Sequence, residues 1–137
     1  MGTRSLVGVM RDNGQCRTVY VHWDGYLDGV GAWLQEYTTQ EAVEELISHG
    51  DRSSLDGPYY KDRGEEGVDP TDYNTFEELF EAANGCGAEY YYVFKDGQWY
   101  CGDCYGRWGH GTGISGKLVP YAEALELQAA EREAEDA

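Results

Sequence analysis

The chain has 137 residues, a formal net charge of −16 and 41% hydrophobic residues. This length suits one domain, which buries roughly two-thirds of the surface of its unfolded chain. No apolar run approaches the ~20 residues of a membrane-spanning helix, and no apolar segment of an export signal follows the N-terminus. The negative charge repels nucleic acids and anionic membranes, so we expect the protein to bind neither directly.

The N-terminal segment predicts a β-hairpin. Residues 6–11 and 17–22 alternate in hydrophobicity as half-buried strands do. Asn13 and Gly14 lie between them and accept the positive φ of a tight turn.

Two helical patterns follow this hairpin. Apolar residues at helical spacing predict a short helix over residues 29–37. Thr38 and Glu41 have the spacing of a capping box, which predicts that a second helix begins there and ends before Gly50.

Residues 51–74 are rich in Gly, Asp and Pro and predict mostly loop, with a short strand possible at Tyr59-Tyr60. Thr75 and Glu78 repeat the capping box and predict a third helix.

The C-terminal half predicts a second hairpin and a last helix. Residues 89–101 are dense in aromatic and β-branched residues and contain the turn signal Asp96-Gly97. Residues 106–116 contain five glycines and predict a loop, and Pro120 suits the first position of the last helix.

These elements predict an α+β fold with a single antiparallel sheet built from two β-hairpins and helices packed on one face. We expect one domain over residues 1–127 and a frayed acidic tail over residues 128–137. Four aromatic residues on amphipathic elements are predicted to build the core: Trp23, Tyr26, Trp33 and Trp99.

The cysteines raise one chemical alternative. Cys101 and Cys104 form a CxxC motif, and the predicted hairpin could bring Cys86 close to it, with Cys16 or His110 as a fourth zinc ligand. Convincing zinc motifs have two such pairs, so reduced thiols without a cofactor are the favoured interpretation and a zinc site is the alternative.

Acidic side chains are the strongest candidates for binding. Carboxylates three or four residues apart on a helix lie about 5–6 Å from each other, close enough to imitate a row of phosphates. The alternative is that they are the solvated sides of amphipathic helices. The candidates are Glu41, Glu44, Glu45, Glu77, Glu78 and Glu81 on predicted helices, and Asp62, Glu65 and Glu66 in the loop.

Several blocks of sequence, in order, resemble a family of small uncharacterised proteins of tailed bacteriophages and prophages. The first blocks are Gly2-Thr3-Arg4-Ser5, Val19-Tyr20-Val21-His22-Trp23-Asp24-Gly25-Tyr26 and Gly29-x-Gly31. The later blocks are Val43-x-x-Leu46-Ile47-x-x-Gly50-Asp51-x-Ser53-Ser54-Leu55, Lys61-Asp62-Arg63-Gly64-Glu65 and Tyr92-x-Phe94-x-Asp96-Gly97-x-Trp99-Tyr100.

The resemblance covers roughly residues 2–105 and implies a phage origin and a setting in the cytoplasm of the bacterial host. It transfers no activity and no catalytic residues. This chain departs from the family pattern at Leu27, where proline is usual, and in its CxxC motif and the segment after Leu118.

Without a catalytic motif, a small acidic chain of this kind is expected to be a binder and not an enzyme. We expect a host protein with a basic surface as its partner, such as nucleic-acid-handling or defence machinery. One alternative is a binder of a small anionic ligand that uses Arg4, Arg11, Arg17 and aromatic residues; another is a zinc-stabilised interaction module.

Overall fold

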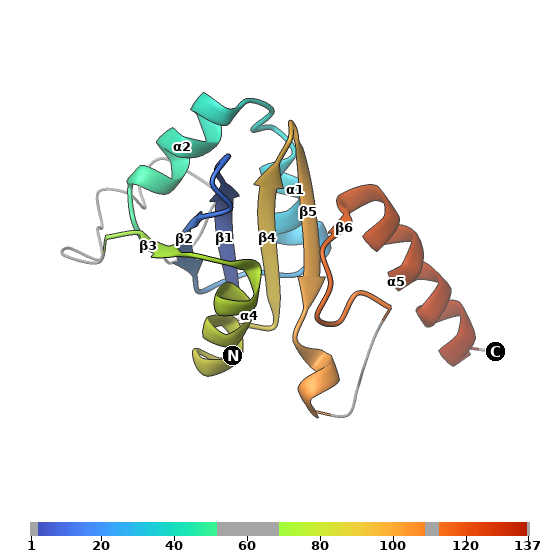
Figure 1. Ribbon diagram of the computed structural model, residues 1–137. Helices are drawn as coiled ribbons and strands as arrows, with labels where there is room; N and C mark the ends of the chain where they lie inside the picture. Colours follow the sequence, from blue (N-terminus) through green and yellow to red (C-terminus); the bar gives the residue numbers. More distant parts are fainter. Residues whose placement is uncertain (1–2, 52–68, 109–112, 137) are drawn as a thin grey trace.

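The computed structural model describes residues 3–51, 69–108 and 113–136. Its centre is a six-stranded sheet in the order β3-β2-β1-β4-β5-β6 (Figure 1). The strands are β1 (Ser5–Met10), β2 (Cys16–Val21), β3 (Thr71–Tyr73), β4 (Tyr90–Lys95), β5 (Gln98–Asp103) and β6 (Val119–Pro120). The helices are η1 (Leu27–Gly31), α1 (Ala32–Leu34), α2 (Gln40–Ser48), α4 (Phe76–Gly85), η2 (Tyr105–Trp108) and α5 (Tyr121–Asp136).

The α+β class is confirmed, but the prediction of a purely antiparallel sheet built from two hairpins is wrong. β1 pairs with β2 and β4 pairs with β5 in antiparallel fashion, whereas β1 and β4 run parallel at the centre of the sheet. Two short strands, β3 and β6, extend the sheet at its edges. The parallel pairing places the turns of both hairpins at the same end of the sheet.

The prediction that helices cover one face is also wrong, because both faces of the sheet carry a buried cluster. Val7, Tyr92 and Phe94 face a cluster that also contains Val30 of η1, and α2 and α5 contribute to the same side. Tyr91 and Val93 face the opposite side, where α4 packs. In Figure 1, α4 lies in front of the sheet and α1 lies behind it. Residues Tyr90 to Phe94 of β4 are all apolar or aromatic because a strand segment buried on both faces needs no polar face.

The Trp-Asp-Gly-Tyr run forms a corner between β2 and η1. The Gly25 amide donates a hydrogen bond to the Thr3 carbonyl at 2.8 Å, and the Val30 amide donates one to the Asp24 carbonyl at 2.7 Å. Asp24 adopts a positive φ of 59°. The sequence predicted one helix over residues 29–37; the structure instead has the π-helix η1 followed by the short α1.

This corner keeps two of its aromatic side chains at the surface. Trp23 is 45% exposed and Tyr26 is 38% exposed, so the prediction that they help to build the core is wrong. Trp99 is only 3% exposed, and Trp33 packs at the edge of the core as a half-buried residue. A turn that reverses the chain at the end of a sheet points its side chains away from both buried layers.

Threonine caps begin both longer helices of the first two-thirds of the chain. The Thr75 hydroxyl accepts a hydrogen bond from the Glu78 amide at 3.2 Å, which confirms the predicted start of α4. In α2 the cap is Thr39 and not the predicted Thr38, because Thr39 accepts from the Ala42 amide at 3.1 Å. Each cap satisfies an amide that has no partner within its helix.

The last helix is longer than predicted. α5 begins at Tyr121, directly after Pro120 of β6, and continues to Asp136 through the segment predicted to be a frayed tail. It packs beside β5 and β6, and its C-terminal end leads away from the sheet (Figure 1). The Gly113 amide donates a hydrogen bond of 2.6 Å to the Glu131 carboxylate, which attaches the middle of the helix to the preceding loop.

Candidate functional site

An exposed acidic row lies on α4. Glu77, Glu78 and Glu81 are all exposed, and Asp69 and Asp72 precede them as exposed residues. No ion pair joins these five carboxylates to a described basic side chain; the ion pairs found in the described ranges lie on α2. The negative charge of this row, which we call the α4 ridge and define as these five residues, is therefore available to a partner.

The acidic row on α2 is partly neutralised within the chain. Glu41 and Glu45 are exposed, whereas Glu44 is half-buried and lies 3.2 Å from the guanidinium of Arg11. The Glu45 carboxylate lies 3.1 Å from the imidazole of His49, one helical turn later. This row consequently offers a partner less unpaired charge than the α4 ridge does.

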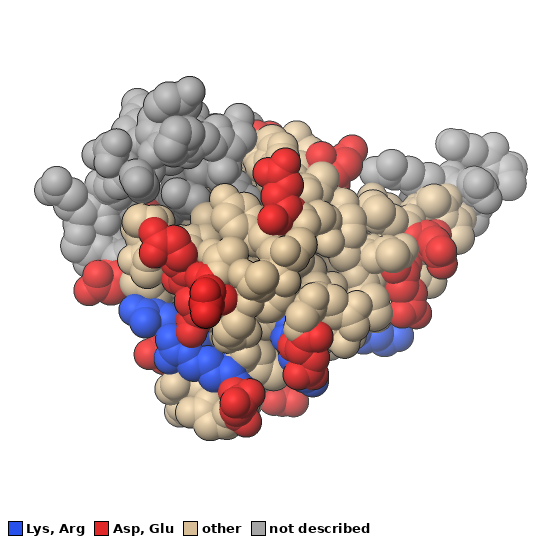
Figure 2. Space-filling view, turned by 90° about the horizontal axis from the view of Figure 1, so that it is seen from above, with Lys and Arg blue, Asp and Glu red and all other residues tan. Residues whose placement is uncertain are grey.

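The two acidic rows do not form one surface, because α2 and α4 pack on opposite faces of the sheet. Figure 2 views the molecule from the end at the top of Figure 1 and shows acidic groups in separate patches, with uncharged surface between them and basic groups beside some of them. The third predicted group, Asp62, Glu65 and Glu66, lies outside the described residues.

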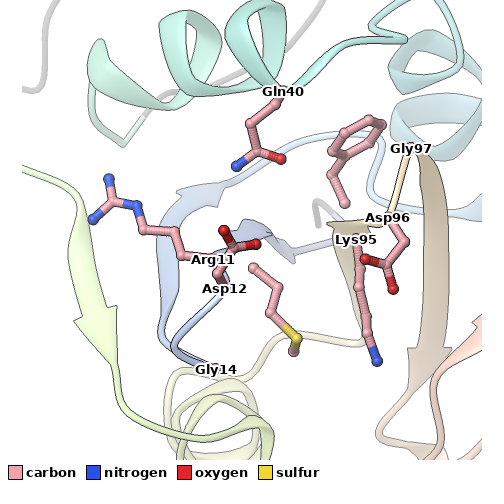
Figure 3. Close-up of a pocket in the computed structure, with 9 residues that line it drawn as sticks. Arg11, Asp12, Gly14, Gln40, Lys95, Asp96 and Gly97 are labelled. Carbon is pink, nitrogen blue, oxygen red and sulfur yellow. The ribbon is translucent and has the colours of Figure 1, made fainter.

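A hollow of about 640 Å³ lies at the turns of the two hairpins. Because β1 and β4 run parallel, their C-terminal ends meet there, as at ligand-binding edges of α/β sheets. Figure 3 shows Gln40 pointing from α2 toward these turns. Arg11 and Lys95 line the hollow together with Asp12 and Asp96. Because these two basic and two acidic side chains balance in charge, the hollow favours neither an anionic nor a cationic ligand.

The three arginines considered for an anionic ligand do not converge. Arg4 precedes β1 and Arg11 follows it, so the six residues of the strand separate them by roughly 20 Å at ~3.3 Å per residue. Arg17 lies in β2, and its Nε atom is buried and has no hydrogen-bond partner among the described residues. Only Arg11 lines the hollow at the hairpin turns.

The proposed zinc ligands lie apart. Cys101 belongs to the cluster on one face of the sheet and Cys104 to the cluster on the other, because residues three apart along a strand point to opposite faces. Cys86 is exposed at the end of α4. In residues 3–51, 69–108 and 113–136, no three His, Cys, Asp or Glu side chains are grouped as metal ligands would be. His110 lies outside these ranges.

The buried thiols hold their protons tightly. Burial, together with a smaller effect of the nearby charge of Asp103, raises the pKa of Cys101 to about 12. Burial also raises the pKa of Cys16. Since a zinc ligand or a nucleophile is a thiolate, this environment favours ordinary reduced thiols.

A second pocket, of about 400 Å³, lies between α4 and the segment that follows β5. Phe80, Glu81 and Asn84 line it from the helix, and Asp103 and Ser115 line it from the other side. Asp103 is 1% exposed, and its carboxylate accepts hydrogen bonds from the Ser115 hydroxyl at 2.5 Å and the Tyr105 amide at 3.1 Å. We refer to this cavity as the α4 pocket.

Little in the amino-acid sequence indicates the α4 pocket. Glu81 was a candidate because of its helical spacing, but Asn84, Asp103 and Ser115 were not. The one available signal was Asp103 itself, a carboxylate between two cysteines at the end of a strongly apolar hairpin. A charge in such a place is normally held by specific partners.

No family model, curated protein or solved structure matches this chain. The likeness to tailed-phage proteins therefore stays a prediction from the sequence blocks. Across the part of the chain that the structure describes, no helix has both the length and the apolar character needed to cross a membrane.

Proposed function

We propose that this protein is a phage-encoded binding protein without catalytic activity and that the α4 ridge contacts a basic surface on a host protein. The observation that carries the proposal is the contrast between the two acidic helices. On α4 the glutamates are exposed and make no ion pair with a described residue, whereas on α2 Glu44 is paired with Arg11.

The contrast matters because a carboxylate already paired within its own chain must lose that partner before it binds another. Exposed unpaired carboxylates lose only water and counterions when they meet a basic surface. Charges exposed in this way are screened over about 8 Å at physiological salt. Their main contribution is thus to speed association and to select partners of opposite charge.

The host target is sought by capture from bacterial lysate on the immobilised protein, elution with salt and mass spectrometry. The captured partner is then titrated against Glu77→Gln/Glu78→Gln and against the matched control Glu41→Gln/Glu45→Gln. Both double variants remove two exposed charges, and Glu77 and Glu41 occupy the same position after their threonine caps.

We expect the α4 variant to bind more slowly and more weakly, by roughly fivefold at low salt, with the difference shrinking as salt rises. The α2 control should bind much as the unmodified protein does. Unchanged binding by the α4 variant would overturn the proposal. Loss of binding only in Arg11→Gln/Lys95→Gln would instead favour an anionic ligand at the hairpin turns.

A further inference from the structure

We propose that the corner between β2 and η1 is a docking surface, separate from the α4 ridge, on which Trp23 and Tyr26 contact a basic segment of a partner protein. We call this surface the aromatic corner and define it as Trp23, Asp24, Tyr26 and Asp28. Trp23 is 45% exposed and Tyr26 is 38% exposed. Two of the three large hydrophobic residues exposed among the described side chains thus lie within four consecutive residues. Exposed apolar side chains that gather in one place mark interaction sites, and Trp and Tyr are the residues most often found at binding hot spots.

The exposed ring of Trp23 is held in place by its neighbours. The imidazole of His22 meets it edge-on, with a centroid distance of 4.7 Å and an interplanar angle of 87°. The Nδ1 atom of His22 in turn shares a hydrogen bond of 2.8 Å with the Tyr20 hydroxyl. An indole fixed in this way loses little rotational freedom when a partner covers it, so more of the contact contributes to binding.

The ring of Tyr26 is fixed at both ends. Its hydroxyl donates a hydrogen bond of 2.9 Å to the Asp24 carboxylate. The ring itself lies against Gly29, where an added Cβ atom would be only 2.8 Å from the Cε2 atom of Tyr26. One side of the ring therefore rests on the start of η1, and its exposed part is available to a partner.

The backbone that carries both rings is fixed as well. The Gly25 amide is bonded to the Thr3 carbonyl at 2.8 Å and the Val30 amide to the Asp24 carbonyl at 2.7 Å. Between these two bonds Asp24 keeps its left-handed φ of 59°, a conformation that persists in a residue other than glycine only when its surroundings hold it. The aromatic corner is therefore ordered before a partner arrives.

The charge of the aromatic corner selects a basic partner. Asp28 is exposed and Asp24 is half-buried, and neither forms an ion pair with a described basic side chain. The hydrogen bond to Asp24 and the charge of that carboxylate raise the pKa of the Tyr26 hydroxyl, and the charge of Asp28 adds to the effect. Both negative charges thus act beside an exposed ring. An arginine or lysine that lies over the face of Trp or Tyr is attracted by the ring and, here, by these carboxylates too.

The aromatic corner differs from the α4 ridge in place and in chemistry. Val30 of η1 belongs to the cluster on one face of the sheet, whereas α4 packs on the other face. The ridge offers exposed carboxylates alone, whereas the corner combines two carboxylates with two large rings. Binding at the corner therefore does not require the ridge, and each surface can be tested alone.

The test is a titration of the ¹⁵N-labelled full chain with an N-acetylated tetraarginine amide, followed by NMR. The uncharged tetracitrulline amide, which has nearly the same shape, and the tetraglutamate amide are the comparison probes. With the arginine peptide we expect saturable shifts of the Trp23 indole N–H and of the Gly25 and Gly29 amides. The citrulline peptide should bind there roughly fivefold more weakly, and the glutamate peptide should produce no saturable shifts at these positions.

Two variants localise the effect, and a third is the matched control. Trp23→Ala should weaken the arginine peptide at the Gly25 and Gly29 amides by roughly fivefold, and Asp28→Asn by roughly twofold. Leu125→Ala removes an equally exposed apolar side chain from α5 and should change nothing at these amides. Preserved amide spectra elsewhere establish that each variant is folded.

Three results would overturn the proposal. The first is an unmoved Trp23 indole N–H, and the second is equal binding of the citrulline peptide at the corner. The third is a set of shifts that grows with protein concentration in the absence of peptide, because the aromatic corner would then pair with a second copy of the chain and not with a basic segment.

The aromatic corner and the α4 ridge fail in different ways. If the captured partner depends on Glu77 and Glu78 while the arginine peptide leaves the signals of the corner unmoved, the corner proposal is wrong and the ridge stands. If the peptide binds the corner as expected while the partner ignores Glu77→Gln/Glu78→Gln, the corner stands and the ridge proposal is wrong.

Discussion

The hydroxyl of Tyr92 in β4 donates a hydrogen bond of 2.6 Å to the carbonyl oxygen of Gly25, 67 residues earlier in the chain. Tyr92 is completely buried, so the bond ties the corner after β2 to the central strand of the sheet. Tyr121 of α5 makes a similar bond of 2.8 Å to the Leu27 carbonyl. The corner after β2 and the start of η1 are thus tied both to the central sheet and to α5.

Removing the hydroxyl of Tyr92 should destabilise the fold. Tyr92→Phe leaves the buried Gly25 carbonyl without its donor, and we expect the free energy of unfolding to fall by about 1–3 kcal/mol. Urea denaturation followed by tryptophan fluorescence measures the change. In the control Tyr100→Phe, the lost hydroxyl accepts from exposed Gln98 and has no other partner among the described residues, so stability should change by less than about 0.5 kcal/mol. Equal losses in both variants would contradict the role of Tyr92.

A methyl group at Gly102 should be poorly tolerated. A Cβ atom there would collide with the Lys117 backbone carbonyl and with the Tyr91 hydroxyl, which is itself bonded to that carbonyl at 2.7 Å. Gly102→Ala should therefore lower the free energy of unfolding by about 1–3 kcal/mol or more.

The matched control for this substitution is Gly85→Ala at the end of α4. A Cβ atom at Gly85 meets nothing within 4 Å, and alanine is the better helix former by up to about 1 kcal/mol. This variant should be as stable as the unmodified protein or slightly more stable by thermal denaturation. A stable Gly102→Ala would show that β5 and the segment before β6 do not lie so close.

Replacing Trp99 by alanine should cost far more stability than replacing Trp23. Trp99 is buried against Phe94, and its indole N–H donates to the Tyr37 carbonyl at 3.0 Å, so Trp99→Ala should cost about 3–5 kcal/mol. Trp23 is 45% exposed, and Trp23→Ala should change stability by no more than about 0.5 kcal/mol. The two midpoints of urea denaturation give the comparison, and similar values would contradict the exposed position of Trp23.

The free energy of unfolding should fall as the pH rises above 9. Burial raises the pKa of Cys101 from 9.0 to about 12, so the unfolded chain loses this proton first as the pH rises. The stabilisation is complete below pH 9 and is lost as the pH rises toward 12. A tenfold change in proton affinity is worth about 1.4 kcal/mol, so this thiol alone accounts for up to ~4 kcal/mol.

Other buried groups act in the same direction, because burial also raises the pKa of Tyr91 and of Tyr92 above the ordinary 10.0. Urea denaturation at pH values on both sides of 9 measures the decline. Cys101→Ala should show a shallower slope than the unmodified protein. A stability that is constant through this range, or that rises, would contradict the burial of these groups.

Local features followed from the sequence because they depend on residues within a few positions of each other. The Asp96-Gly97 turn has positive φ at both residues, 51° and 83°, as a tight hairpin requires. The cap of Thr75 on Glu78 is equally local. In α2 the same reasoning chose the wrong one of two adjacent threonines, since the spacing alone does not decide which hydroxyl reaches an amide.

The pairing of strands that are distant in the sequence, and the exposure of individual side chains, were decided only by tertiary packing. The parallel pairing of β1 with β4 joins segments more than 80 residues apart, such as Ser5 with Tyr90, and it depends on the fit of two apolar faces. β3 is a polar, largely exposed edge strand that carries no hydrophobic alternation. The exposure of Trp23 follows from the direction of a turn.

The amino-acid sequence by itself determined the class of fold, the local turns and one helix cap, and the excess of negative charge. Tertiary structure decided which acidic helix is paired: Arg11 follows β1 and reaches Glu44 on α2, whereas the α4 ridge has no comparable partner among the described residues. It also placed Asn84 of α4 and Asp103 of β5 in one pocket. The physical reason is that net charge and periodicity are properties of the chain, whereas ion pairs and cavities exist only between segments brought together by burial of the core.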